Sequence, residues 1–263
     1  MKINSLGIKT DLMFLKQNAM VEDRGDYILV RSPDNPEFFW GNFLIFPEPP
    51  QKGDFKQWQR HFENEFAKVD GIEHMTFEWD HSSRAPQLDE FRQNGFEYEE
   101  TVVLVAKDGL HPMYENHEIS MMRVETNETW HQLVEFQIEV NPDGYPEDSL
   151  RPFVKKRFQD YRDYSEAGLG HWYAAFLDGK MVADLGLYSE NGVARYQNIK
   201  THRDYRKQGI AQTLMHFAAS DLGADYFVIQ AEDHGPAINM YQSIGFEALE
   251  VIAGLCRYDQ SKW

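Results

Sequence analysis

The stretch of sequence that decides the fold is residues 198–211, which read NIKTHRDYRKQGIA. A strand ends in this stretch and a helix follows directly after a loop in which Gly209 and Ala211 leave the backbone unshielded. The first amides of a helix lack partners and lie at the positive end of its dipole, so this turn can hold a pyrophosphate. Arg206 and Lys207 add formal positive charge at the same place. An ordinary strand-to-helix turn with solvated basic residues has the same pattern, so this stretch alone leaves both interpretations open.

A second motif lies thirty residues after this loop, where residues 241–247 read YQSIGFE. Together the two motifs resemble the GNAT family of N-acetyltransferases. Residues 206–211 match the family's acetyl-CoA signature, Q/R-x-x-G-x-G/A, and residues 241–247 look like its Y-x-x-x-G-F-E ending. The resemblance covers about residues 117–258 and implies the GNAT fold and binding of acetyl-CoA. Two positions depart from the pattern: Arg203 replaces the usual proline, and His234 replaces an asparagine that contacts the cofactor in many members.

The resemblance also implies which residues hold acetyl-CoA. The backbone of the strand should pair with the pantetheine arm, because in this family that strand and the next one splay apart. The amides of the loop and of the first helical turn should cradle the diphosphate. The expected cofactor-binding residues are Ile199, Lys200, Thr201, Arg206, Lys207, Gln208, Gly209, Ile210, Ala211, Gln212 and His234. Acetyl-CoA is then a co-substrate, and no metal is expected because the ten histidines show no ligand spacing.

Acyl transfer to an amine requires a neutral amine, a polarised thioester carbonyl and a proton for the departing thiolate. The resemblance implies that Tyr241 supplies this proton, whereas the structural alternative is a core tyrosine packed beneath the last strand. The sequence does not identify the base; we take Glu232 as the candidate, beside Asp233 and Asp184. An imidazole such as that of His234 titrates near neutrality, but a lone histidine in a loop is more often simply solvated.

The first half of the chain carries a faint repeat of the second. Residues 91–97 read FRQNGFE, 150 positions before the YQSIGFE motif. We therefore expect an α/β fold with a mixed sheet, in which residues 113–263 form a GNAT-like catalytic domain and residues 1–112 a degenerate, incomplete GNAT-like domain. The first half has Phe91 in place of the tyrosine and lacks the phosphate-binding signature. We expect acetyl-CoA to bind only the second half, and the first half to complete the core or the acceptor site.

Hydrophobic patterning predicts the elements of both halves. In the first half we expect strands at 27–31, 38–46, 75–79 and 101–106, a helix with an apolar face of Phe55, Trp58, Phe62 and Phe66, a short helix at 88–93, and no pair of opening helices. In the second half we expect strands at 119–124, 172–177, 181–188 and 226–231, a further strand ending at Thr201, and helices after Asn127, at 149–167 and at 210–222. Asp178-Gly179 is typical of a tight hairpin turn.

Composition limits the possible partners and location. The 263 residues are 14% aromatic, which excludes a disordered chain, and the net charge of −17 repels phosphate. Nucleic acid and membranes are therefore not expected partners, and a cationic amine is favoured. The single cysteine, Cys256, permits no internal disulfide and favours a reducing cytoplasm. No run of 18 apolar residues is present. The state of association is left open as monomer or homodimer.

These observations favour an N-acetyltransferase that moves acetyl from acetyl-CoA to the amine of a small molecule or peptide. Two alternatives stay open. The protein could transfer another acyl group, because the loop recognises CoA and not the acyl chain. It could also be a non-catalytic CoA-binding or sensing module, because a fold does not fix a function.

Overall fold

The computed structural model describes residues 1–80, 82–141, 144–232, 235 and 237–258. The chain forms two compact units, each of which takes segments from distant parts of the sequence. Unit 1 contains residues 1–103, 230–233 and 249–263, and unit 2 contains residues 104–229 and 234–248. The expected domain boundary between residues 112 and 113 stays a prediction. Among the described helices, none is both long enough and apolar enough to cross a membrane.

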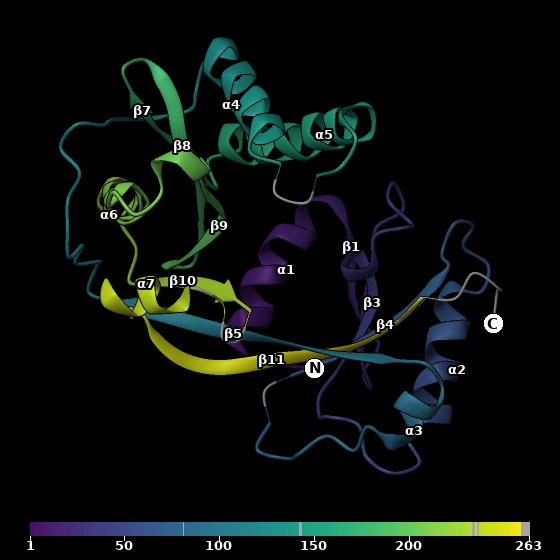
Figure 1. Ribbon diagram of the computed structural model, residues 1–263. Helices are drawn as coiled ribbons and strands as arrows, with labels where there is room; N and C mark the ends of the chain where they lie inside the picture. The colour runs from purple at the N-terminus through teal and green to yellow at the C-terminus, as the bar shows by residue number, and fades with distance from the viewer. Residues whose placement is uncertain (81, 142–143, 233–234, 236, 259–263) are drawn as a thin grey trace. The chain divides into compact units, whose positions relative to one another are not determined.

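Unit 1 is a mixed sheet with helices (Figure 1). Its elements are α1 (Leu6–Asn18), β1 (Met20–Asp23), β2 (Ile28–Arg31), the 3₁₀ turn η1 (Phe39–Gly41), β3 (Asn42–Phe46), α2 (Phe55–Phe66), β4 (His74–Trp79), α3 (Asp89–Gln93), most of β5 (Glu97–Lys107) and most of β11 (Glu247–Tyr258). The strand order in this unit is β1-β2-β3-β4-β11-β5. β3 and β4 are parallel, and β4 and β11 are antiparallel.

The core of unit 1 is aromatic. The predicted stripe of Phe55, Trp58, Phe62 and Phe66 is buried on α2 and packs on the face of β4 that carries Phe77. The Phe46 and Trp58 rings stack with centroids 3.8 Å apart. The last strand of the chain closes this core: β11 pairs with β4 over six positions, from Ala253–Trp79 to Tyr258–His74, and Leu255 lies fully buried in the cluster.

Two features of the first half differ from expectation. Helix α1 was not foreseen; it is one helix and not the pair of opening helices that we expected this half to lack. The expected strand at 38–46 begins only at Asn42, because residues 39–41 form the turn η1. In this turn the Phe38 ring packs so closely on Gly41 that a Cβ at position 41 would overlap it. The other predicted elements of this half are present, with β5 longer than expected.

Unit 2 is likewise built on mixed β-sheet, with helices on both faces. Its elements are β6 (Ser120–Arg123), α4 (Asn127–Glu139), α5 (Glu147–Glu166), β7 (Gly170–Leu177), β8 (Lys180–Glu190), β9 (Val193–Thr201), the 3₁₀ turn η2 (Arg203–Tyr205), α6 (Ile210–Leu222), most of β10 (Tyr226–Ala231) and α7 (Ile238–Ser243). The strand order in this unit is β10-β9-β8-β7-β6, and the end of β5, residues 104–107, also belongs to it. The expected α/β fold with a mixed sheet is confirmed.

Neighbouring residues of β7 show which helices cover which face of this sheet (Figure 1). Trp172 packs on Phe158 of α5, with ring centroids 4.9 Å apart. The next residue, Tyr173, packs on Phe217 of α6, and its hydroxyl donates to Asp221 (2.8 Å). Because successive side chains of a strand point to opposite faces, α5 covers one face and α6 the other.

Candidate functional site

Strand β9 is the element on which the candidate site is built. It pairs in parallel with β10 only over residues 193–195, opposite residues 226–228. β9 then continues to Thr201, and over residues 196–201 the only pairing that the structure describes is with β8 on its other side. The edge that faces away from β8 can therefore accept an added extended chain, as β-augmentation does. Ile199, Lys200 and Thr201, the residues expected to meet the pantetheine arm, all lie in this part of β9.

A bulge interrupts β9 within the same region. Its register with β8 changes from Gly186–Gln197 to Asp184–Lys200, so one residue of β8 faces two residues of β9. Asn198 at the bulge has a positive φ of 49°. A bulge bends its strand and re-aims the residues that follow, so it determines where residues 199–201 point.

The loop after β9 leads to the N-terminus of α6. The Nε of Arg206 donates to the carbonyl of Thr201 (3.1 Å), which ties the loop to the end of the strand. The first hydrogen bond of α6 runs from the Thr213 amide to the Gly209 carbonyl (3.1 Å). The amides of residues 210–212 precede that bond and lie at the positive end of the helix dipole. Lys207 is exposed beside them. This donor set fits a diphosphate.

Gly209 and Lys207 hold the loop in a left-handed conformation. Their φ angles are 75° and 61°, a region that favours glycine and that is uncommon for lysine. A Cβ on Gly209 would overlap the ring of Tyr114 and lie 3.0 Å from the Tyr114 carbonyl oxygen. The sequence suggested that this glycine makes room for phosphate; the structure shows that it also makes room for Tyr114.

The segment around Tyr114 clamps the loop, and local sequence patterns did not reveal it. The side-chain amide of Asn116 donates to the Gln208 carbonyl (2.9 Å), and the Asn116 backbone amide donates to the Thr213 hydroxyl (2.9 Å). The Met113 amide donates to the side-chain oxygen of Gln212 (3.1 Å). The Gln212 side chain thus supports the loop, which leaves its backbone amide as the group that can meet a ligand.

Tyr241 is 8% exposed on the short helix α7 and packs on Phe246 with ring centroids 6.0 Å apart. Its backbone amide donates to the Ala237 carbonyl (3.0 Å). Within the described part of the chain its hydroxyl makes no hydrogen bond. Burial raises the pKa of Tyr241 to about 12, so the phenol stays protonated at neutral pH and can donate.

The candidate bases differ in environment. Glu232 is exposed after β10 and belongs to unit 1, and its role stays a prediction. Asp184 is fully buried on β8 in unit 2, and burial raises the pKa of its carboxyl to about 7. Asp233 and His234 lie outside the described residues, so the expected cofactor contact of His234 stays a prediction. In the described ranges, no cluster of three or more histidine, cysteine, aspartate or glutamate residues could hold a metal ion.

The corresponding parts of unit 1 are arranged differently. β3 stays paired with the parallel strand β4 up to its last residue, and the Asp80 amide extends the pairing by donating to the Phe46 carbonyl (2.8 Å). The amide of Gly53, just before α2, donates to the carboxylate of Glu90 (3.2 Å). Phe91, at the position of Tyr241 in the repeat, is fully buried in the aromatic core. The counterparts of the β9 edge and of the α6 N-terminus in unit 1 therefore both have partners within unit 1.

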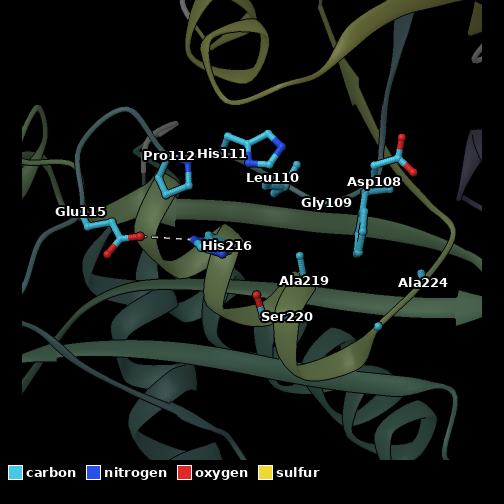
Figure 2. Close-up of a pocket in the computed structure, with 12 residues that line it drawn as sticks. Asp108, Gly109, Leu110, His111, Pro112, Glu115, His216, Ala219, Ser220 and Ala224 are labelled. Carbon is cyan, nitrogen blue, oxygen red and sulfur yellow. Dashed lines mark ion pairs between the residues drawn. The ribbon is translucent and has the colours of Figure 1, made fainter.

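Figure 2 shows a cavity elsewhere in unit 2, with a volume of about 580 Å³. Residues 108–112 and the C-terminal half of α6 line it, and Glu115 and His216 form an ion pair at its rim (3.5 Å). Its described lining includes none of the residues that the sequence indicated for cofactor or catalysis. The cavity is therefore separate from the loop and α6 N-terminus.

Comparisons with known proteins agree with this geometry. Residues 168–248 match the family model described as an acetyltransferase (GNAT) domain. No curated protein gives a significant match. Among solved structures, a functionally unknown conserved protein from Staphylococcus epidermidis has a TM-score of 0.77 at 12% identity, covering 92% of this chain and 94% of that one.

Two further solved structures carry the same fold. A GCN5-related N-acetyltransferase from Kribbella flavida has a TM-score of 0.67 at 16% identity, covering 98% of this chain and 96% of that one. A tandem GNAT protein from the clavulanic acid biosynthesis pathway has a TM-score of 0.59 at 12% identity, with coverages of 94% and 87%. The recognition of a GNAT domain from the two sequence motifs is confirmed, and so is the GNAT-like fold.

Proposed function

We propose that unit 2, which carries the GNAT domain, is an N-acetyltransferase that moves acetyl from acetyl-CoA to the amine of a small molecule or peptide. The observation that carries this proposal is the edge of β9 at residues 196–201, which leads directly to the α6 N-terminus. A strand edge suits an extended amide-containing arm, and a helix N-terminus suits a diphosphate. CoA contains both groups in that order.

In this proposal the backbone of Ile199–Thr201 pairs with the pantetheine arm. The amides of residues 207–212 bind the diphosphate, and the charges of Arg206 and Lys207 lie beside it. Because the backbone makes these contacts, single side-chain changes at Lys207 or Gln208 should have mild effects.

The reaction forms a bond between the amine nitrogen and the acyl carbon and breaks the bond from that carbon to sulfur. The departing thiolate takes a proton, for which we propose the hydroxyl of Tyr241, protonated at neutral pH and without another described partner. The amine loses a proton to a base, for which Glu232 is our candidate through an intervening water. The proton that Glu232 takes from the amine returns through solvent to the Tyr241 phenolate, so each turnover restores both groups.

We also propose that unit 1 is a degenerate copy that does not bind acetyl-CoA. The continued pairing of β3 with β4, the Gly53–Glu90 contact and the buried Phe91 support this. The net charge of −17 favours a cationic acceptor, and the single buried thiol of Cys256 favours the cytoplasm.

The test is release of free thiol from acetyl-CoA, measured with a panel of small amines and basic peptides, beside calorimetry of CoA binding. We expect CoA binding and amine-dependent thiol release. Binding without turnover on any amine would favour the CoA-binding module, and faster turnover with a longer acyl-CoA would favour transfer of another acyl group. Absence of CoA binding would refute the assignment of the site.

A further inference from the structure

A buried polar cluster in unit 2 links two neighbouring strands through one helix residue. Asp184 of β8 is fully buried, and Gln137 of α4 donates from its Nε2 to the Oδ2 of Asp184. The Oε1 of Gln137 accepts from the Nζ of Lys200 (2.8 Å) and from the Nδ2 of Asn198 (3.2 Å), both on β9. Gln137 is itself only 2% exposed. A single amide thus connects a buried carboxyl group to two residues of β9.

The two β9 residues in this cluster flank the point at which the strand changes course. Asn198 is the bulge residue with positive φ, and Lys200 is the first residue beyond the bulge that pairs with β8. A residue other than glycine keeps a left-handed backbone conformation only where its surroundings stabilise that conformation. Gln137 therefore holds both ends of the bulge, directly before the strand edge described above.

We propose that Asp184 is a positioning residue, which acts through Gln137 to fix the bulge of β9 and so sets how tightly unit 2 holds the pantetheine arm of acyl-CoA. This inference rests on the proposed function, because it takes β9 to be the strand that meets CoA. It assigns Asp184 a role other than that of the base that takes the amine proton.

Counting donors and acceptors shows that the cluster is built around a carboxylate. Gln137 Nε2 and Trp172 Nε1 are donors, and Lys200 carries a cation. In the described surroundings, Asp184 Oδ1 and Trp172 Nε1 make no hydrogen bond. A protonated Asp184 would add a donor to the cluster, in which the acceptor Gln137 Oε1 already serves two other donors. Turning the Gln137 amide over would bring its donors against the Lys200 ammonium group. Protonation removes the charge that strengthens the hydrogen bond from Gln137 Nε2, and so it weakens the link from Asp184 through Gln137 to β9.

The protonation state of Asp184 changes in the neutral range. Burial raises its pKa to about 7, while Gln137, the charge of Lys200 and the indole of Trp172 act in the opposite direction. Lys200 on β9 is the charged group among these neighbours, and the groups from α4 and β7 are neutral. We therefore expect the cluster to hold β9 more firmly above pH 7 than below it, so CoA should bind more tightly as the pH rises from 6 to 8.

The experiment measures the dissociation constant of free CoA for the full chain by calorimetry between pH 6 and 8.5. Wild type should bind about tenfold more tightly at pH 8 than at pH 6, the change expected from one buried hydrogen bond. Asp184→Asn should bind at every pH as wild type does at pH 6. Gln137→Met should behave in the same way, and Gln132→Met, an exposed change on the same helix, should match wild type. Because CoA has its own titrating phosphate, the comparison between variants carries the result.

Equal pH dependence in wild type and Asp184→Asn, or unchanged affinity in Gln137→Met, overturns the inference. Circular dichroism checks that each variant folds. If one of the two variants does not fold, the other is enough for the test. Because the measured quantity is CoA binding, the two proposals fail in different ways. CoA that does not bind wild type refutes the proposed function, whereas CoA that binds without this pH dependence refutes only the role of Asp184.

Discussion

Leu255→Ala, a change in the last strand β11, should destabilise unit 1, which also contains residues 1–103. Leu255 is fully buried in the aromatic core of unit 1 and lies opposite Phe77 of β4. Shortening a core leucine removes buried methyl groups and leaves a cavity, at a cost of about 2–5 kcal/mol. This is a large fraction of the roughly 5–15 kcal/mol that stabilises a typical domain.

Urea unfolding gives the total change in free energy, and hydrogen exchange read by mass spectrometry gives its location. We expect Leu255→Ala to lower protection in β3 and β4, at residues 42–46 and 74–79, before it affects β8 and β9. Leu249→Ala, on the same strand but 57% exposed, is the matched control and should change stability by less than about 0.5 kcal/mol.

Two results would refute this reasoning. A loss smaller than about 1 kcal/mol would mean that Leu255 does not lie in a packed core. A loss of protection confined to β8 and β9 would mean that β11 stabilises unit 2 and not unit 1, against the pairing of β11 with β4.

Four further outcomes follow from the same structure. Tyr241→Phe should lower turnover by roughly 10²- to 10⁴-fold with CoA affinity unchanged, and equal turnover would assign the tyrosine to the core. Gly209→Ala should weaken CoA binding and cost more stability in thermal melts than Gly223→Ala, because both have positive φ but only Gly209 faces Tyr114. Calorimetry should give one CoA per chain, and a value of two would contradict the degenerate role of unit 1. The pKa of Asp184 is raised to about 7 from its usual 3.8, so between these values the folded state binds a proton that the unfolded state does not. As the pH rises from 4 to 8, the free energy of unfolding of wild type should therefore fall by up to about 4 kcal/mol relative to that of Asp184→Asn.

Features of the fold with local causes were predictable from the sequence. The α6 and β10 boundaries match the expected ranges, and Asp178-Gly179 has two positive φ angles, as its tight turn requires. Helix α1 was missed although Ser5 caps it locally, by accepting from the Ile8 amide (3.1 Å); two further amides at its N-terminus depend on distant carboxylates. The Ser5 amide donates to Asp80 (2.7 Å), and the Gly7 amide donates to Glu250 (2.8 Å).

The candidate site also has parts that local motifs indicated and parts that they did not. The loop and the tyrosine were found from motifs, because a helix N-terminus and a signature spacing are local. The clamp by Asn116 and the link through Gln137 were missed, because each joins residues more than 45 positions apart. Asp184 was named only as a possible base, since the sequence does not show that its neighbours are donors that tie it to β9.

The pairing of β4 with β11 also places a condition on biosynthesis. β4 ends at Trp79, and the strand that pairs with it ends about 180 residues later, at Tyr258. At roughly 5–20 residues per second, a ribosome needs on the order of ten to forty seconds to make that strand. During this interval one edge of β4 lacks its partner, beside a cluster rich in phenylalanine and tryptophan. Unpaired strand edges promote aggregation. We therefore expect the nascent chain to depend on chaperones, and a product that stops before Ala253 to aggregate.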